Sequence, residues 1–245
     1  MFVKGRSMKK NIKTVLLTAL MPAFLSTAAM AGDPLIAADA ATPEAIQSAI
    51  DVAFGAAVTS NYISRGITQS DNKPAFQAYM EATYGIVYAG VWGSTVDFGD
   101  DNKGEFDLSA GIRPEFGKFA LDIGYVRYLY MADGDCCGEA YVKADFAATD
   151  SFTVGGEVFQ DFAAKTTYLR GKASYALPQD FEVSGGFGAY AQFKQQDWDV
   201  GVSKTLADVA TLDLRYFGYH DDVDTTHKFA VSLSFDTSLS ALRGK

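Results

Sequence analysis

Apolar and polar residues alternate along most of the chain, in segments of roughly ten residues that begin near Val52 and end near Phe235. The last of these segments spaces Phe229, Val231 and Leu233 two residues apart, with small or polar residues between them. Because successive side chains of a strand point to opposite faces, the pattern predicts strands with one apolar face and one polar face.

About twelve such segments follow one another, an even number, as single-chain bacterial barrels have. After removal of a signal peptide, about 214 residues leave roughly 18 for each strand and its connection. The connections alternate between a tight set at 84–85, 114–118, 148–150, 178–180 and 206–208 and a longer, acidic set at 64–73, 97–103, 133–139, 161–166, 195–197 and 221–226. A closed meander explains this alternation, because every second connection emerges on the same side.

Aromatic residues cluster near both sets of connections. Near the long set lie Tyr62, Phe98, Tyr130, Phe159, Tyr190, Phe193, Trp198, Phe217 and Tyr219; near the tight set lie Phe54, Tyr84, Phe116, Phe119, Phe152, Tyr175, Phe181 and Phe235. Two aromatic belts are typical of a membrane barrel. The sequence therefore predicts an all-β fold, a transmembrane antiparallel up-and-down β-barrel of about 12 strands.

The N-terminal residues predict export. Five basic residues precede the apolar run 15–25, which is followed by Ala29-Met30-Ala31. This arrangement is typical of a secretory signal peptide with a small-residue cleavage site, and an uncleaved anchor is the alternative. We expect a signal peptide at 1–31, an N-terminal periplasmic extension at 32–50, the barrel at 51–236 and a C-terminal tail at 237–245, in a protein of the outer membrane.

Composition narrows the partners. A net charge of −9 argues against nucleic acid, whose phosphates would be repelled. The two cysteines, Cys136 and Cys137, are adjacent and form neither a disulfide framework nor a C-x-x-C motif. Three interpretations stay open for them: an incidental loop pair, a vicinal disulfide, or a soft-metal site with neighbouring carboxylates.

One segment carries a family resemblance. The stretch 60–77, SNYISRGITQSDNKPAFQ, with 88–94 and 105–111, resembles the TorF family of porin-like proteobacterial outer-membrane proteins, whose function is largely uncharacterised. Its core is R-G-x-(S/T)-Q-S followed by P-A-x-Q. Here Ile63 and Ser64 replace an aromatic-containing pair before Arg65, and Phe235 would take the place of the terminal aromatic residue of many barrels. The resemblance implies a barrel that acts as a porin.

If the apolar faces meet lipid, the polar faces line the lumen. The acidic candidates there are Glu81, Glu105, Asp107, Glu115, Asp122, Asp145, Glu157, Glu182 and Asp213, and the basic candidates are Arg113, Lys143, Arg170, Lys172 and Arg215. An excess of carboxylates lowers the electrostatic barrier to cations, so a water-filled lumen would weakly favour them. In the alternative, opposite charges pair across the lumen and close it.

The segment that contains Arg65, Gly66, Asp71 and Lys73 predicts a constriction in the mouth, in which Arg65 and Lys73 face acidic partners. Gly66 permits a turn with positive φ, and Pro74 can start the next strand without donating to a ladder. Turn formation alone is the alternative reason for this motif.

Three functions remain open. The first is a porin-like channel for passive diffusion of small polar or ionic solutes, the second a closed structural or surface-binding barrel, and the third a soluble periplasmic ligand-binding barrel. We expect no enzyme. The only histidines, His220 and His227, bracket one acidic loop, so no other histidine could act as the base for a serine nucleophile. That loop suggests a solvated tip or, alternatively, a site for divalent ions that bridge lipopolysaccharide. No cofactor is expected; the expected partners are outer-membrane lipid, lipopolysaccharide and the solutes.

Overall fold

The computed structural model describes residues 50–206 and 208–244. The expected signal peptide, and all of the expected periplasmic extension except Ile50, lie outside these residues. Within the described part of the chain, no helix is long and apolar enough to cross a membrane.

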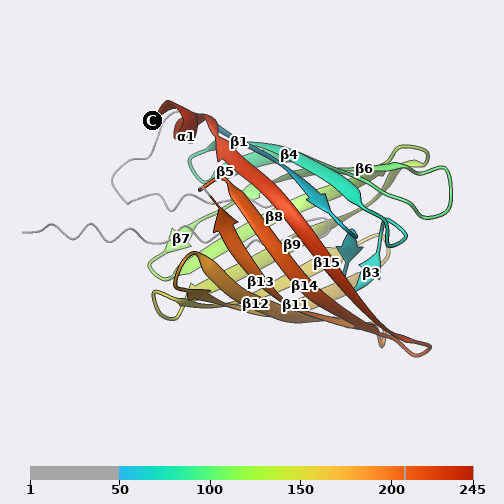
Figure 1. The fold of residues 1–245 in the computed structure, drawn as a ribbon. Coiled ribbons are helices and arrows are strands. Elements are labelled where there is room, and N and C mark those ends of the chain that lie inside the picture. Colours follow the sequence, from blue (N-terminus) through green and yellow to red (C-terminus); the bar gives the residue numbers. More distant parts are fainter. Residues whose placement is uncertain (1–49, 207, 245) are drawn as a thin grey trace, which may run out of the picture.

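Twelve long antiparallel strands form a closed barrel (Figure 1). Each pairs with its neighbours in chain order, and β1 pairs with both β4 and β15, which closes the ring. The prediction of an up-and-down barrel of about twelve strands is confirmed. The strands are β1 (Asp51–Thr59), β4 (Ala75–Tyr84), β5 (Val87–Thr95), β6 (Gly104–Ile112), β8 (Phe119–Tyr130), β9 (Gly134–Ala147), β10 (Phe152–Asp161), β11 (Thr166–Leu177), β12 (Phe181–Tyr190), β13 (Gln196–Leu206), β14 (Ala210–His220) and β15 (Thr225–Ser238).

Four short elements complete the fold. The hairpin of β2 (Ile63–Ser64) and β3 (Ile67–Thr68) lies between β1 and β4, β7 (Glu115–Phe116) lies between β6 and β8, and α1 (Leu239–Arg243) follows β15. The segment expected as a tail thus begins inside the last strand, which ends at Ser238. The Ser238 side chain caps α1 by accepting a hydrogen bond from Ala241 N.

The two ends of the barrel differ. The start of β1, the end of β15, α1 and the tight turns lie at one end, which we call the terminus end; the other is the loop end (Figure 1). The loop-end connections 60–74 and 96–103 are long, as expected. The acidic segment 133–139 instead lies almost entirely in β9. The segments 161–166 and 221–226 keep only short connections, 162–165 and 221–224, because the flanking strands pair up to these residues.

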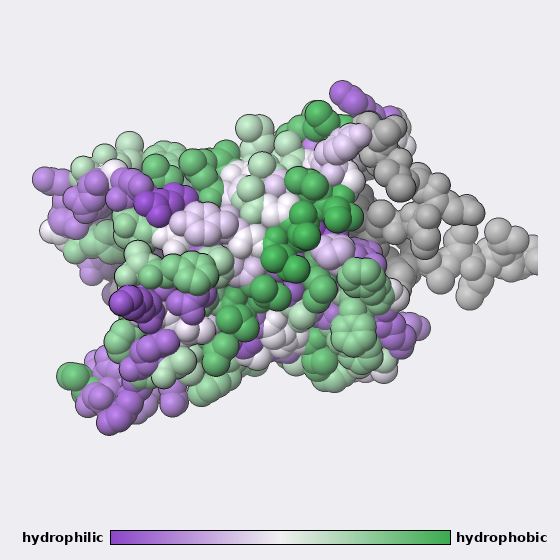
Figure 2. Space-filling view, turned by 180° about the vertical axis from the view of Figure 1, so that it is seen from behind, coloured by the Kyte–Doolittle hydropathy of each residue, from purple (hydrophilic) through white to green (hydrophobic). Residues whose placement is uncertain are grey.

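The barrel is polar inside and apolar outside. On β14, Leu212 and Leu214 are 44% and 56% exposed, whereas Asp213 and Arg215, which alternate with them, are 4% and 1% exposed. Figure 2 shows apolar residues across the wall and hydrophilic residues gathered at the loop end. A soluble barrel would place its apolar faces inward, so this arrangement argues against the soluble ligand-binding alternative.

The loop-end aromatics correct one expectation. Phe98 and Phe193 are exposed, as an outer belt requires, but Tyr62, Phe159 and Phe217 are buried. Strand periodicity explains this finding, because Phe159 and Phe217 each lie two residues from a buried charged residue and therefore share its face. The terminus-end belt is largely exposed, as at Phe116, Phe119, Tyr175 and Phe235 among others.

Arg127, which the pattern places on the apolar face, lies exposed on β8 and pairs with Asp135 of β9 at 2.5 Å. A register shift between Tyr128 and Leu129 accompanies it. The strand therefore accommodates this charge with a local bulge near the loop end.

Candidate functional site

The β2–β3 hairpin ends in a two-residue turn. Ser64 pairs with Ile67 across it, and the central residues Arg65 and Gly66 have φ angles of 45° and 78°. Positive φ at both central residues defines a type I′ turn, whose preferred sequence is Asn-Gly. Arg65 thus occupies a backbone position that disfavours long side chains, which suggests that its side chain has a use.

The backbone of the hairpin tip rests against β14, which lies two places from β1 in the ring. A Cβ on Gly66 would lie 2.8 Å from Tyr219 Cβ and 3.0 Å from the Gly218 carbonyl oxygen. Only glycine fits this approach. Beside it, Ile63 packs with Phe217 of β14 and Ala230 of β15.

Tyr62 fixes the base of the hairpin. Its hydroxyl donates to Glu105 Oε2 at 2.8 Å, and its ring meets Trp92 edge-on with centroids 5.6 Å apart. Burial, followed by the negative charge of Glu105, raises the pKa of Tyr62. The Glu105 carboxylate also accepts a hydrogen bond from the Tyr130 hydroxyl at 2.9 Å. Glu105, predicted as a lumen residue, therefore holds the loop in place.

The outer part of the same loop is tied at the surface. Lys73 Nζ lies 2.7 Å from Asp97 and 3.0 Å from Asp71, and Lys103 contacts Asp97 from the other side. The hydrogen bonds from Lys73 and then Lys103 hold the pKa of Asp97 well below its usual range. Asp71 and Lys73 therefore lie at the exposed rim, whereas Arg65 and Gly66 lie inside.

Arg65 reaches a cluster that we call the cage: Glu139 of β9, Phe159 of β10, Tyr168 of β11 and Tyr190 of β12. Its guanidinium donates to Glu139 Oε1 at 3.0 Å and Oε2 at 2.6 Å, and to the Tyr190 hydroxyl oxygen at 2.5 Å. The three ring centroids lie 4.3 to 5.4 Å from its Cζ atom.

This contact crosses the lumen. In the ring of twelve strands, β9 to β12 lie diametrically opposite the connection from β1 to β4 that carries Arg65. Burial alone would lower the pKa of Arg65, but the hydrogen bonds and charge of Glu139 outweigh it and the pKa is raised. The cation is therefore fully retained at the point where the loop meets the opposite wall.

A cavity of about 330 Å³ opens beside the hairpin. Arg65 and all four cage residues line it, together with Tyr62, Glu105, Tyr128, Tyr130, Cys137, Glu157, Asp161, Arg170 and others. Its wall is thus rich in aromatic rings, and its carboxylates outnumber its two guanidinium groups.

Below the hairpin, charged side chains pair along the wall. Arg113 binds Glu81 at 2.6 Å and Asp122 at 3.1 Å, and its guanidinium carbon lies 3.6 Å from the centroid of Tyr88. Lys172 binds Glu157 at 2.9 Å and Asp145 at 3.2 Å.

A second group surrounds Arg170 and Arg215. Arg170 contacts Asp197 at 3.3 Å and also Asp199, and Arg215 contacts Asp213 at 3.0 Å and again Asp199. Sequence reasoning did not select Asp197, Asp199 or the Glu139 partner of Arg65. The alternation does place Asp197 and Asp199 on one face of β13, opposite Trp198 and Val200, so the signal was present.

The other lumen candidates lie at several depths. Asp107 is 1% exposed, Lys143 Nζ lies 4.6 Å from the Tyr141 centroid, and Glu182 has one buried oxygen without a hydrogen-bond partner. The structure corrects the prediction that Glu115 lines the lumen. Glu115 lies exposed in β7, because the chain turns there between β6 and β8.

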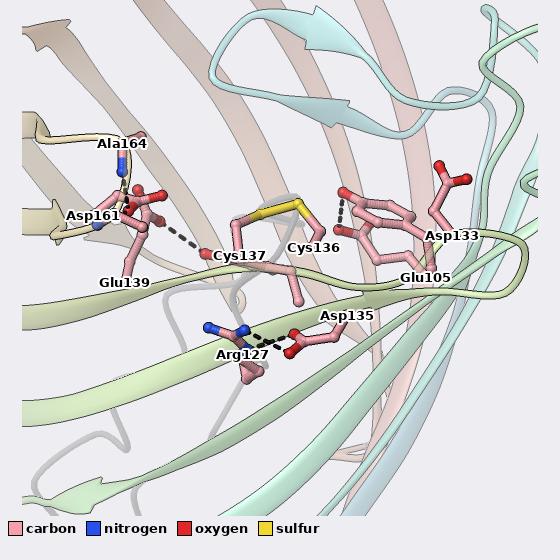
Figure 3. The surroundings of a disulfide bond; sticks show 12 residues. Glu105, Arg127, Asp133, Asp135, Cys136, Cys137, Glu139, Asp161 and Ala164 are labelled. Carbon is pink, nitrogen blue, oxygen red and sulfur yellow. Dashed lines mark hydrogen bonds and ion pairs between the residues drawn. A yellow bond between two sulfur atoms is a disulfide. The ribbon is translucent and has the colours of Figure 1, made fainter.

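The two cysteines form a disulfide within β9. Figure 3 shows it on one side of the strand and the Arg127–Asp135 pair on the other. Cys137 lines the cavity, two residues before Glu139. Of the three interpretations of these cysteines, the structure therefore supports the vicinal disulfide and not the incidental loop pair.

Across residues 50–206 and 208–244, no group of three or more His, Cys, Asp or Glu side chains is arranged to hold a metal ion. His220 instead contacts Thr225 Oγ1 at 2.8 Å, and His227 contacts the Tyr216 hydroxyl at 2.6 Å.

Fold and lumen define a β-barrel of porin type. The chain belongs to the Gcw_chp family, described as bacterial proteins of unknown function, whose model matches residues 43–241. The KdgM porin is similar in structure, with a TM-score of 0.56, 10% identity, and coverage of 76% of this chain and 98% of that one. The NanC porin gives a TM-score of 0.51 and 12% identity, with coverage of 76% and 99%. No curated protein matches the sequence.

Proposed function

We propose that this protein is an outer-membrane channel for passive diffusion of small polar or ionic solutes, constricted by the β2–β3 hairpin. The observation that carries the proposal is a closed twelve-stranded barrel whose buried residues are charged and whose exposed wall is apolar. Lipid is the medium that such a wall fits. A barrel of this size is wider than an eight-stranded one, which side chains fill.

The membrane assignment rests on three supports. The N-terminal sequence predicts export through a cleaved signal peptide, the apolar wall fits lipid, and the acidic loop end can meet lipopolysaccharide through bridging cations. The resemblance of residues 60–77 to the TorF family agrees with it. One structure of the KdgM porin holds disordered oligogalacturonate, which supports solute passage as the role of this architecture.

The direction of the ion pairs favours a wet lumen. Among the described residues, the ion pairs of Arg113, Arg170, Lys172 and Arg215 join strands at most two positions apart in the ring. Such pairs run along the wall and do not bridge the barrel from one side to the other. The Arg65 contact does cross the axis, and it comes from a loop that can move without breaking the barrel.

Selectivity follows from charge. Carboxylates outnumber cationic groups among the lumen candidates, and Asp197, Asp199 and Glu139 add to the excess. A lumen of this kind lowers the barrier to cations, so the channel weakly favours them.

The second candidate is a closed structural or surface-binding barrel. The same hairpin favours it, because Tyr62, Ile63, Arg65 and Gly66 fill space between opposite walls. A permanently docked hairpin would stop passage.

Planar-bilayer recording of the refolded mature protein tests these alternatives. Tyr62 O accepts a hydrogen bond from Gln69 N at 2.7 Å, so a Gly-Gly turn can replace residues 63–68 without moving the loop base. We expect discrete conductance steps that grow in this variant, and no growth when Asp100 and Asp101 are deleted from the 96–103 loop. Silence of both inserted proteins would favour the closed barrel.

The same recording under a salt gradient tests selectivity. In an alkaline buffer, in which this carboxyl group is ionised, Glu182→Gln removes a lumen charge at a carboxylate with an unsatisfied oxygen, and we expect the reversal potential to move toward zero. An unchanged reversal potential would contradict the cation preference.

A further inference from the structure

Arg65 occupies the cage as a ligand occupies a binding site. The cage offers one carboxylate that accepts two parallel hydrogen bonds and three aromatic faces within cation–π distance. A planar guanidinium uses both features, whereas an ammonium ion cannot form the paired hydrogen bonds. The chemistry of the cage therefore selects guanidinium groups.

The cage does not depend on Arg65 for its shape. The Tyr168 hydroxyl donates to both oxygens of Asp197, at 3.0 and 2.9 Å, and the Tyr128 hydroxyl donates to Glu139 Oε2 at 2.8 Å. The Tyr168 and Tyr190 rings pack with centroids 5.2 Å apart. These contacts lie among paired barrel strands, so the site stays formed when the guanidinium leaves.

Arg65, in contrast, comes from a loop and sits at a strained turn position. Its side chain is 21% exposed, and it faces a cavity of about 330 Å³, which lies in the range of small-molecule sites, ~300–1,000 Å³. A solute can therefore approach the cage from the cavity while Arg65 still occupies it.

We infer that the cage is a binding site for solutes that carry a guanidinium group, and that such a solute competes with Arg65 and releases the hairpin from the opposite wall. This inference rests on the proposed channel function and names the solute class that it admits. Because a tethered group competes at high effective concentration, the native protein binds these solutes weakly, and removal of Arg65 unmasks the site.

Arg65→Asn is the variant of choice, because Asn-Gly is the preferred type I′ turn and the hairpin keeps its shape. The probe is methylguanidinium, and its affinity for the folded protein in detergent is measured by ligand-detected NMR. We expect at least about tenfold tighter binding to Arg65→Asn than to the native protein, since the competitor no longer reduces the free fraction of the cage.

Matched controls isolate the chemistry. Methylammonium keeps the charge but cannot form the paired hydrogen bonds, and N-methylurea keeps the planar shape without the charge, so both should gain clearly less affinity than methylguanidinium. Adding Glu139→Gln to Arg65→Asn should remove the gain. Equal affinity of the native protein and Arg65→Asn, or an unchanged gain after Glu139→Gln, would overturn the inference.

Arg65→Gly gives a second empty cage that also tolerates positive φ, and the same outcomes apply to it if Arg65→Asn does not insert. Bilayer recording then separates the two proposals. Binding without conductance in any variant would refute the channel and keep the site, whereas conductance without a gain in binding would refute the site and keep the channel.

Discussion

The loop-end half of the lumen and the half below it are held by different kinds of contact. In the loop-end half, one loop binds Glu105 of β6 through Tyr62 and carries Arg65 across the axis to the cage. In the lower half, Arg113, Arg215 and their partners bind along the wall, between neighbouring or next-neighbouring strands.

The difference shows where this barrel can move. Wall pairs are part of the sheet and buried, so they can be lost only at a large cost. The hairpin contacts can be broken while every barrel strand stays paired. We therefore expect a gate in the loop-end half of the lumen and a rigid lining in the lower half. The following variants test this division.

Arg215→Ala should give the largest effect. Arg215 is 1% exposed, and its loss leaves Asp199 and Asp213 buried without this cation. Breaking a buried pair in this way costs about 3–5 kcal/mol, which urea unfolding followed by the heat-dependent gel shift of folded barrels would detect. Arg127→Ala, which breaks an exposed pair, is the control and should barely move the midpoint. Equal midpoints would contradict the rigid lower half.

Gly66→Ala should detach the hairpin and leave the barrel intact. The added Cβ meets Tyr219 at 2.8 Å, and the φ of 78° is unfavourable for alanine, by roughly 1–2 kcal/mol. We expect faster protease cleavage within residues 60–74 and an unchanged unfolding midpoint.

Gly85→Ala is the matched control for this variant. Gly85 also has a positive φ, 58°, but its Cβ position is open. In Gly85→Ala, cleavage of the 60–74 loop should stay at the rate of the native protein. If both variants behave alike, backbone strain alone explains the result and the docking contact does not.

Tyr62→Phe should weaken the hairpin base by about 1.5 kcal/mol, the lower end of the range for a hydrogen bond to a charged group. The ring contact with Trp92 is kept, whereas the bond to Glu105 is lost. This weakening should appear as a modest rise in the frequency of open events in bilayer recordings. An unchanged frequency would mean that the Tyr62–Glu105 hydrogen bond does not hold the base of the gate.

The rim pair of Lys73 and Asp97 should give the smallest effect. The pKa of Asp97 is held below its usual range by Lys73 and Lys103, so its contribution is present at neutral pH and is lost as the pH falls below about 4. Cleavage of the 60–74 loop by an acid-stable protease should rise in this window, and less so in Asp97→Asn. Equal acid sensitivity of both proteins would exclude this pair as its source.

The barrel itself could be read from the sequence because its physics is local. Strand alternation assigns each residue to one face, and only one face of Leu212, Asp213, Leu214 and Arg215 can meet lipid. The same rule, applied to polar and aromatic residues alike, would have assigned Phe159 and Phe217 to the interior. The prediction of an outer belt places them outside because it uses only their distance from the loops and not their strand face.

What the sequence determined is therefore the class of fold, the strand faces and the candidate lumen charges, since each depends on neighbours in the chain. Only the tertiary structure decided which charges meet. Arg65 and Glu139 are 74 residues apart, and Arg65 and Tyr190 are 125 apart. Such contacts depend on closure of the ring, which brings the first loop opposite β9 to β12, and no local pattern encodes that distance.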